Sequence, residues 1–250
     1  MRAAETFASF QWSFSVDHLH ETRRLVEHSL AIDPTYARAH ALLSRTYSSA
    51  WVSPGNSDFL QPETLARAHR AARSAVQLDP NLPQARAQLS YVLAFQGEHA
   101  LSIAEFERAC ARNPNFTDWR FTLALVYAGE FARAIQAAQD HMRADPFYHS
   151  VTSGLLGLAF YMLKDYAEAL PQLEEAVSRA PNWGHGHIFL AATYAQMGQS
   201  EHAGREAAEV MRIVPGFTID STARRIMAFK NPSDADHFFD GLAKAGLPAK

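Results

Sequence analysis

The sequence predicts an all-α protein made of about six repeated helical hairpins, followed by C-terminal capping helices. Apolar residues recur at the spacing of helices with one buried face. Six similar segments each end in a proline, and the intervals between these prolines are 46, 34, 32, 35 and 34 residues. A nearly constant period of this size is typical of proteins that stack one structural unit on the next. The prolines are Pro34, Pro80, Pro114, Pro146, Pro181 and Pro215.

Each predicted unit consists of two helices joined by a tight turn, as residues 83–112 illustrate. The first helix spans 83–95 and is followed by Gln96-Gly97, where a glycine can adopt the left-handed C-cap conformation. The second helix spans 101–112 and places Phe106 and Ala109 on one stripe. Pro114 stops this helix, because proline lacks an amide donor and disfavours the helical conformation in the residue before it.

The unit resembles the tetratricopeptide repeat (TPR), a helical hairpin of about 34 residues. A leucine followed by a small residue marks the first helix in Leu43-Ser44, Leu89-Ser90, Leu123-Ala124, Leu156-Gly157 and Leu190-Ala191. An aromatic residue follows that leucine by four positions at Tyr47, Tyr127, Phe160 and Tyr194, and Leu93 departs from the pattern. A small residue opens the second helix at Ala68, Ser102, Ala134, Ala169 and Ala203. Small residues let two helices approach closely.

The resemblance implies a right-handed α-solenoid over residues 1–216, with capping helices in 217–250. A single hairpin cannot bury its own apolar face, so each unit is expected to depend on its neighbours. The first unit matches the signature less well than the others, as is usual at the end of an array. The expected units are 3–36, 37–82, 83–116, 117–148, 149–183 and 184–216.

Two segments depart from the period. The extra residues of the second unit predict a loop over 48–61, in which Trp51 and Phe59 anchor the loop to the array. Beyond Pro215, a last helix is expected to begin at Ser233, with Asp236 as a partial capping signal, and to end at Gly246. This C-terminal segment is expected to cover the exposed face of the last hairpin.

Composition limits the class of partner and compartment. The 23 Lys and Arg against 26 Asp and Glu give a net charge of −3, so we expect no nucleic-acid partner. The single cysteine, Cys110, cannot close an intramolecular disulfide and is interpreted as a packing thiol. No apolar run is long enough to span a membrane. We therefore expect a soluble, cytoplasmic protein.

No motif in the sequence predicts catalysis, so we expect no enzyme activity and no cofactor. Glycine-rich phosphate loops and a nucleophile elbow are both missing from the sequence. The closest histidine pairs are His18 with His20 and His185 with His187. Residues two apart on a helix point to different faces, so these pairs do not predict a metal site.

The resemblance implies that the first helices of the units line a concave groove that binds a partner protein, peptide or helix. Their side chains are mostly apolar and aromatic, as is common at binding sites. The alternative is that these aromatic residues pack between adjacent first helices or against the C-terminal segment. The predicted partner-binding residues are Leu42, Arg45, Gln88, Tyr91, Phe95, Phe121, Leu125, Leu155, Leu158, Tyr161, Met162, His185, Ile188, Phe189 and Gln196.

One type of partner is disfavoured by the same positions. TPR proteins that grip the C-terminal carboxylate of chaperones use basic residues and asparagines. The sixth position of the units lacks asparagine, which argues against such a carboxylate partner. The residues at that position are Leu42, Gln88, Thr122, Leu155 and Phe189.

Two functions fit these features. The first is a non-enzymatic scaffold for protein–protein interaction, and a homo-oligomer is compatible with it. The second follows from the tail 237–248, which is similar to the C-terminus of bacterial multidomain proteins with a TPR array behind a class III adenylate cyclase or winged-helix domain. That likeness implies a regulatory or sensory signalling module, although the metal-binding aspartates of the cyclase domain are absent from this sequence.

Overall fold

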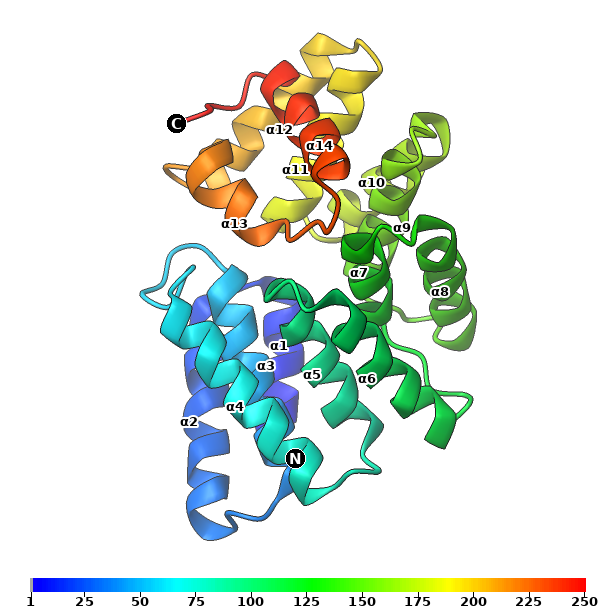
Figure 1. Cartoon of the computed structure of the whole chain (residues 1–250). Coiled ribbons are helices and arrows are strands. Elements are labelled where there is room, and N and C mark those ends of the chain that lie inside the picture. Colours follow the sequence, from blue (N-terminus) through cyan, green and yellow to red (C-terminus); the bar gives the residue numbers. More distant parts are fainter. Residues whose placement is uncertain (1) are drawn as a thin grey trace. The chain divides into compact units, whose positions relative to one another are not determined.

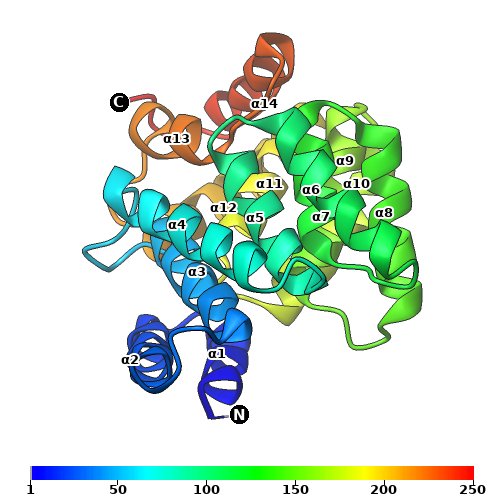
Figure 2. The same cartoon turned by 60° about the horizontal axis from the view of Figure 1, so that its bottom comes forward.

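The computed structural model describes residues 2–250, apart from the side chains at positions 11 and 12, and every regular element in that range is a helix. This confirms the predicted all-α class. Successive helices form antiparallel pairs (Figures 1 and 2). The chain divides into two compact units, residues 1–116 and 117–250.

The unit 1–116 contains three hairpins. Helices of the same hairpin pack together, and α2 and α4 each also contact the first helix of the next hairpin. The elements are α1 (Arg2–Ser13), α2 (Val16–Ile32), α3 (Ala37–Val52), α4 (Pro62–Leu78), α5 (Pro83–Phe95) and α6 (His99–Arg112).

The unit 117–250 contains three further hairpins and the C-terminal helices. Its hairpin helices are α7 (Trp119–Ala128), α8 (Phe131–Ala144), α9 (Ser150–Met162), α10 (Tyr166–Arg179), α11 (Gly184–Gln196) and α12 (Ser200–Ile213). They are followed by a π-helix, η1 (Ile219–Ala223), the short α13 (Arg224–Ile226) and α14 (Pro232–Lys244).

The small residues of the repeat lie where the two helices of a hairpin meet. All five small residues predicted in the second helices (Ala68, Ser102, Ala134, Ala169 and Ala203) have no exposed surface. In the hairpin of α3 and α4, Ser44 Oγ donates a hydrogen bond to the carbonyl of Ala68 at 2.7 Å. In the hairpin of α9 and α10, the two helices come close at Gly157, which packs against the side chain of Leu173.

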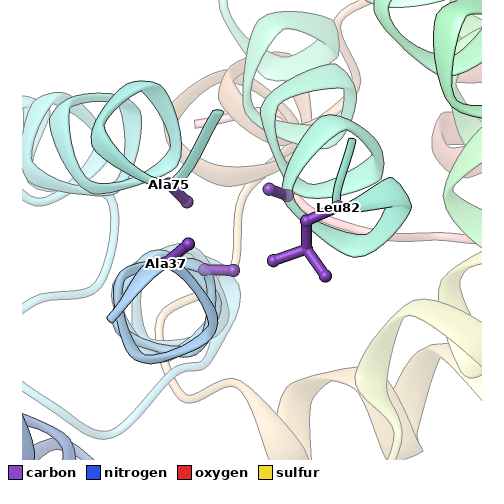
Figure 3. Packing of buried hydrophobic residues seen from close by; sticks show 5 residues of the cluster. Ala37, Ala75 and Leu82 are labelled. Atoms are coloured by element: carbon purple, nitrogen blue, oxygen red, sulfur yellow. The ribbon is translucent and has the colours of Figure 1, made fainter. Parts of the chain in front are cut away.

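Alanines also connect one hairpin to the next. Figure 3 shows Ala37 of α3, Ala75 of α4 and Leu82, just before α5, directed toward one another. Ala75 has no exposed surface, and Leu82 is 5% exposed. This cluster joins the second hairpin to the first helix of the third, so a hairpin gains core contacts from its neighbour.

The turn between hairpins depends on the residue before proline as well as on the proline. Asp33, Asp79 and Asp145 are C-caps in extended conformation, and each carboxylate accepts a hydrogen bond from a backbone N–H two residues later. This is an Asx turn, which a short carboxylate side chain favours. The sequence prediction used only the proline and did not include this role of the aspartate.

The inserted loop is shorter than predicted, because α3 continues to Val52 and the loop occupies residues 53–61. Trp51 therefore lies in the helix, 5% exposed, with its ring 5.2 Å from that of Phe95. Burial of this large side chain against α5 favours the extra helical turn. The loop is joined to α2 by an ion pair between Arg23 and Asp58 at 2.8 Å.

The last helix begins earlier than predicted. Its N-cap is Asn231 and Pro232 is its first residue, whereas the sequence pattern predicts a start at Ser233. Proline suits the first helical position because its missing N–H has no intrahelical acceptor there. The helix ends at Lys244, and Gly246 follows with φ +85°, a conformation that glycine adopts without strain.

We expect Gly157→Ala to destabilise the protein by about 1–2 kcal/mol, because the new methyl group would overpack the contact between α9 and α10. A Cβ at this position would lie 2.6 Å from Leu173 Cγ and 3.0 Å from the carbonyl oxygen of Ala169. Gly204→Ala in α12 is the matched control, since its Cβ would meet no atom within 4 Å. We expect this control to stabilise the helix by about 0.5–1 kcal/mol. Urea denaturation measures the free energy of unfolding of both variants, and an equal change in the two would contradict the packing role of Gly157.

Candidate functional site

The candidate site lies on the first helices of the unit 117–250. Helix α9 packs between α7 and α11, so one side of these three helices forms a continuous surface. We call this surface the inner face and define it by Tyr127, Tyr161, Phe189, Ala192 and Gln196. These five residues come from α7, α9 and α11, and each has a contact with residues 217–250.

The C-terminal segment first reaches the inner face at α7. Tyr127 Oη donates a hydrogen bond to the carbonyl of Ile226 at 3.1 Å, and the N–H of Lys230 donates one to the carbonyl of Tyr127 at 2.8 Å. The ring of Phe229 lies 5.6 Å from that of Tyr127 in an edge-to-face arrangement. Residues 226–230 are therefore fixed to α7 by both backbone and side-chain contacts.

Helix α14 then packs on α9 and α11 through an aromatic cluster. Phe238 has no exposed surface, and its ring lies 5.8 Å from that of Tyr161 and 6.0 Å from that of Phe189. Edge-to-face pairs of this kind add stability beyond the area that they bury. Tyr161 Oη donates a hydrogen bond to the carbonyl of His237 at 3.3 Å, and burial raises the pKa of this phenol.

The helices approach most closely at Gly241. A Cβ at this position would overlap with Tyr161 Oη and would lie 3.1 Å from Ala192 Cβ. Leu242, the next residue, has no exposed surface. A glycine opposite an alanine thus lets α14 lie directly on α11, and a larger residue at either position would separate the helices.

Polar contacts surround this apolar centre. Gln196 Nε2 donates a hydrogen bond to Asp240 at 3.0 Å, and Gln196 Oε1 accepts one from Lys244 at 3.2 Å. Lys244 also forms an ion pair with Asp240 at 2.6 Å. The hydrogen bonds from Lys244 and Gln196 lower the pKa of Asp240. Because Asp240 and Lys244 are exposed and Gln196 is partly exposed, these contacts are expected to orient α14 more than to stabilise it.

His237 is the titratable side chain at the centre of this interface. Its imidazole stacks on the ring of Tyr161 at 4.9 Å and lies 3.4 Å from Tyr166 Oη. Burial and the positive charge of Lys164 lower the pKa of His237, and Asp240 only partly offsets them. The neutral imidazole is therefore the form that fits between α9 and α14.

The predicted site residues are distributed over both units, and most of them are buried. The buried ones are Gln88, Tyr91, Phe95, Leu125, Leu155, Leu158, Tyr161, Met162, Ile188 and Phe189. The partly exposed ones are Leu42, Arg45, Phe121, His185 and Gln196. Of the predicted set, Tyr161, Phe189 and Gln196 lie together on the inner face.

In the unit 1–116, the predicted residues contact one another and their neighbouring helices. Gln88 is buried and donates hydrogen bonds to Ser44 and Ser48 of α3 at 3.1 and 3.0 Å. The ring of Tyr91 lies 4.9 Å from that of Phe95. The guanidinium of Arg45 lies over the ring of Phe7, 4.4 Å from its centre.

The predicted site residues do not include two residues of the inner face. The prediction that the C-terminal segment covers the last hairpin was incomplete, whereas the alternative that first-helix aromatics pack against this segment agrees with the contacts of Tyr161 and Phe189. Tyr127 was recognised as a repeat residue only, and Ala192 was not considered. The segment was expected on the last hairpin, whereas it also extends to α7 and α9. The aromatic residues Phe229 and Phe238 were the available signal, since a solvent-facing cap does not need several buried aromatics.

The described residues offer little for metal or thiol chemistry. Among them, no group of three or more His, Cys, Asp or Glu side chains is arranged to hold a metal ion. Cys110 Sγ lies 3.5 Å from the carbonyl of Phe116, and burial raises the pKa of its thiol. His187 Nδ1 lies 2.7 Å from a carboxylate oxygen of Glu206. None of the described helices is both long and apolar enough to cross a membrane.

Comparison with known proteins gives the class of fold. The family model "Tetratricopeptide repeat" matches residues 83–116, which is the third predicted unit. No curated protein sequence gave a significant match. Among solved structures, TTC0263, a thermophilic TPR protein of Thermus thermophilus, is 20% identical with a TM-score of 0.55. The match covers 66% of this chain and 91% of that one.

Two longer solved structures match over nearly the whole chain. The human IFIT1 dimer with PPP-AAAA is 18% identical with a TM-score of 0.67, covering 94% of this chain and 57% of that one. The structure of the APC/C hetero-tetramer Cut9-Hcn1 is 17% identical with a TM-score of 0.65, covering 96% and 45%. At these identities the likeness shows the fold, which is that of TPR-type α-solenoids.

Acidification is expected to weaken the docking of α14. Because the pKa of His237 is lower in the folded protein than its ordinary value of about 6.5, the unfolded chain binds the proton more readily. The stability from neutral His237 is present above that value and is lost as the pH falls below it. Urea denaturation at pH 7.5 and at pH 5.5 measures how much the free energy of unfolding decreases on acidification. We expect this decrease to be smaller for His237→Gln than for the wild type. An equal loss would mean that His237 is not a titrating group of this interface.

Proposed function

We propose that the protein is a non-enzymatic scaffold that binds a partner protein or peptide through the first helices of its hairpins. The TPR-type fold supports this class of function, since stacked hairpins present extended surfaces for binding. The observation that carries the proposal is the inner face, which holds an amphipathic helix through Tyr161 and Phe189. Laying a helix on an apolar face is a recurring mode of peptide recognition.

The fifteen predicted residues form the proposed binding region. A partner can contact the partly exposed residues of this set directly. His185 and Gln196 lie on α11, and Leu42 lies on α3. Buried members such as Leu155 and Phe189 shape the surface through packing and need not touch the partner. A partner that contacts both kinds would combine apolar anchors with a polar rim, as most interfaces do.

The charge and the cysteine content support a protein partner inside the cell. The net charge of −3 provides no basic excess for phosphate groups. The single cysteine, Cys110, forms no intramolecular disulfide, which is compatible with a reducing compartment such as the cytoplasm. A second copy of the chain remains one candidate partner among proteins.

Site-directed photocrosslinking tests the proposal by position. A photoreactive amino acid at Leu42, His185 or Gln196 is expected to capture partner protein, because these positions lie on first helices and are partly exposed. The same group at Arg73 or Arg205, exposed residues of the second helices α4 and α12, is the matched control. Capture is measured by mass spectrometry of the crosslinked products. Equal capture from both sets of positions would reject the first-helix surface.

A second candidate is a regulatory or sensory module of an adenylate-cyclase-like or transcription-regulator protein. It rests on the likeness of the tail 237–248 to that group. In the structure this tail has a packing role, with Gly241 against Ala192 and Leu247 only 4% exposed. A reading frame that joins this chain to a cyclase or DNA-binding segment would favour the second candidate over the first.

A further inference from the structure

The inner face is covered by the chain's own C-terminal segment, and the extent of this cover is more than an end cap needs. A segment that only shielded the end of the array would contact α11 and α12. Residues 226–230 instead contact Tyr127 in α7, with a separation of 99 residues along the chain between Tyr127 and Ile226. The contacts to α7 and α9 therefore need another explanation.

We propose that residues 227–247 are an intramolecular ligand of the inner face, and that the partner is an amphipathic helix with the same contact pattern that takes their place. This inference rests on the proposed function and names the class of partner. It commits to a helix with an aromatic residue, a small residue three positions later and a leucine after that. Phe238, Gly241 and Leu242 show this pattern in α14.

The inner face recognises a helix by the spacing of these three residues. Residues three and four apart lie on one side of a helix, so Phe238, Gly241 and Leu242 face α9 and α11 together. Phe238 and Leu242 have no exposed surface. Gly241 lies where a Cβ would overlap with Tyr161 Oη. A helix lacking the small residue would be held away from the face, so the pattern provides specificity as well as affinity.

The polar contacts set the direction of the bound helix. Tyr161 Oη and Gln196 Nε2 both donate to the carbonyl of His237, and Gln196 also contacts Asp240 and Lys244 further along α14. A partner helix running in the same direction would need an acidic residue two positions after its aromatic residue. The opposite direction would leave Gln196 without these partners.

Helix α14 is suited to exchange because it depends on the face that it covers. It has 13 residues, a length at which an isolated helix is only marginally stable in water. It is connected to α13 through the non-helical residues 227–231. A covalent tether of this kind gives an effective concentration of the order of millimolar, so a free helix competes at a disadvantage unless the tethered one is weakened.

The test uses the full chain and a synthetic peptide of residues 229–248 labelled with fluorescein. Phe238→Ala in the chain removes an anchor of the tethered helix and leaves the inner face unchanged. We expect this variant to bind the peptide at least about tenfold more tightly than the wild-type chain, measured by fluorescence anisotropy, because its face is more often vacant. Asp236→Ala, an exposed residue of α14, is the control in the chain and is expected to behave as the wild type.

Two substituted peptides test the contact pattern. The Gly241→Leu peptide is expected to lose at least about tenfold in affinity for the Phe238→Ala chain, because its side chain meets Tyr161 and Ala192. The Ala243→Leu peptide adds a side chain of the same size on the exposed side of the helix and is expected to bind as the unsubstituted peptide does. Equal binding of the two substituted peptides would overturn the proposal, as would equal binding of the peptide to both chains.

A second measurement covers the case in which Phe238→Ala fails to fold. Hydrogen exchange of the wild-type chain is expected to show faster exchange of the α14 amides than of the α9 and α11 amides, since α14 opens by itself. Exchange of all three helices at one common rate would overturn the proposal.

If a photocrosslinked partner is retained equally by the wild type and Phe238→Ala, the partner binds elsewhere and only this inference fails. If the peptides behave as expected and no partner is captured, the proposed function fails instead.

Discussion

The structure depends on the close approach of the two helices in each hairpin. Where α9 crosses α10, Leu173 lies so close to Gly157 that a Cβ at position 157 would not fit. Where α3 crosses α4, Ser44 reaches the carbonyl of Ala68. Contacts as short as these require small residues at fixed positions, and they are local in sequence. The period of about 34 residues in the sequence therefore corresponds to the recurrence of this helix–helix contact in each hairpin.

Close packing inside the hairpins determines what remains on the other side of the first helices. With the small residues turned toward the second helix, the larger side chains Tyr161 and Phe189 lie on the inner face. An isolated surface of this kind would expose aromatic rings to water. In the unit 117–250 it is buried by residues 226–247, so the three hairpins of this unit and the C-terminal segment form one compact unit.

The parts of the structure that could be predicted are those encoded by neighbouring residues. Ala68, Ala134 and Ala169 were predicted at helix contacts from the resemblance to the TPR signature, and all three are fully buried. The end of α3 was predicted too early, because burial of Trp51 against Phe95 outweighs the local turn signal of the loop. Packing of first-helix aromatics against the C-terminal segment was one predicted alternative. The extension of this segment to α7 was not predicted, since Tyr127 and Ile226 are 99 residues apart and Ile226 lies outside the repeat.

Burial also limits how the inner face can open. Undocking α14 without replacement would expose Phe238 and Leu242 together with the rings of Tyr161 and Phe189, and each such side chain costs about 1.5–3 kcal/mol when it is fully returned to water. A vacant face is thus a state of high free energy, whereas a face on which one helix has replaced another keeps nearly all of this burial. For that reason exchange of helices is favoured over simple opening, and the sequence pattern of α14 describes what the face accepts.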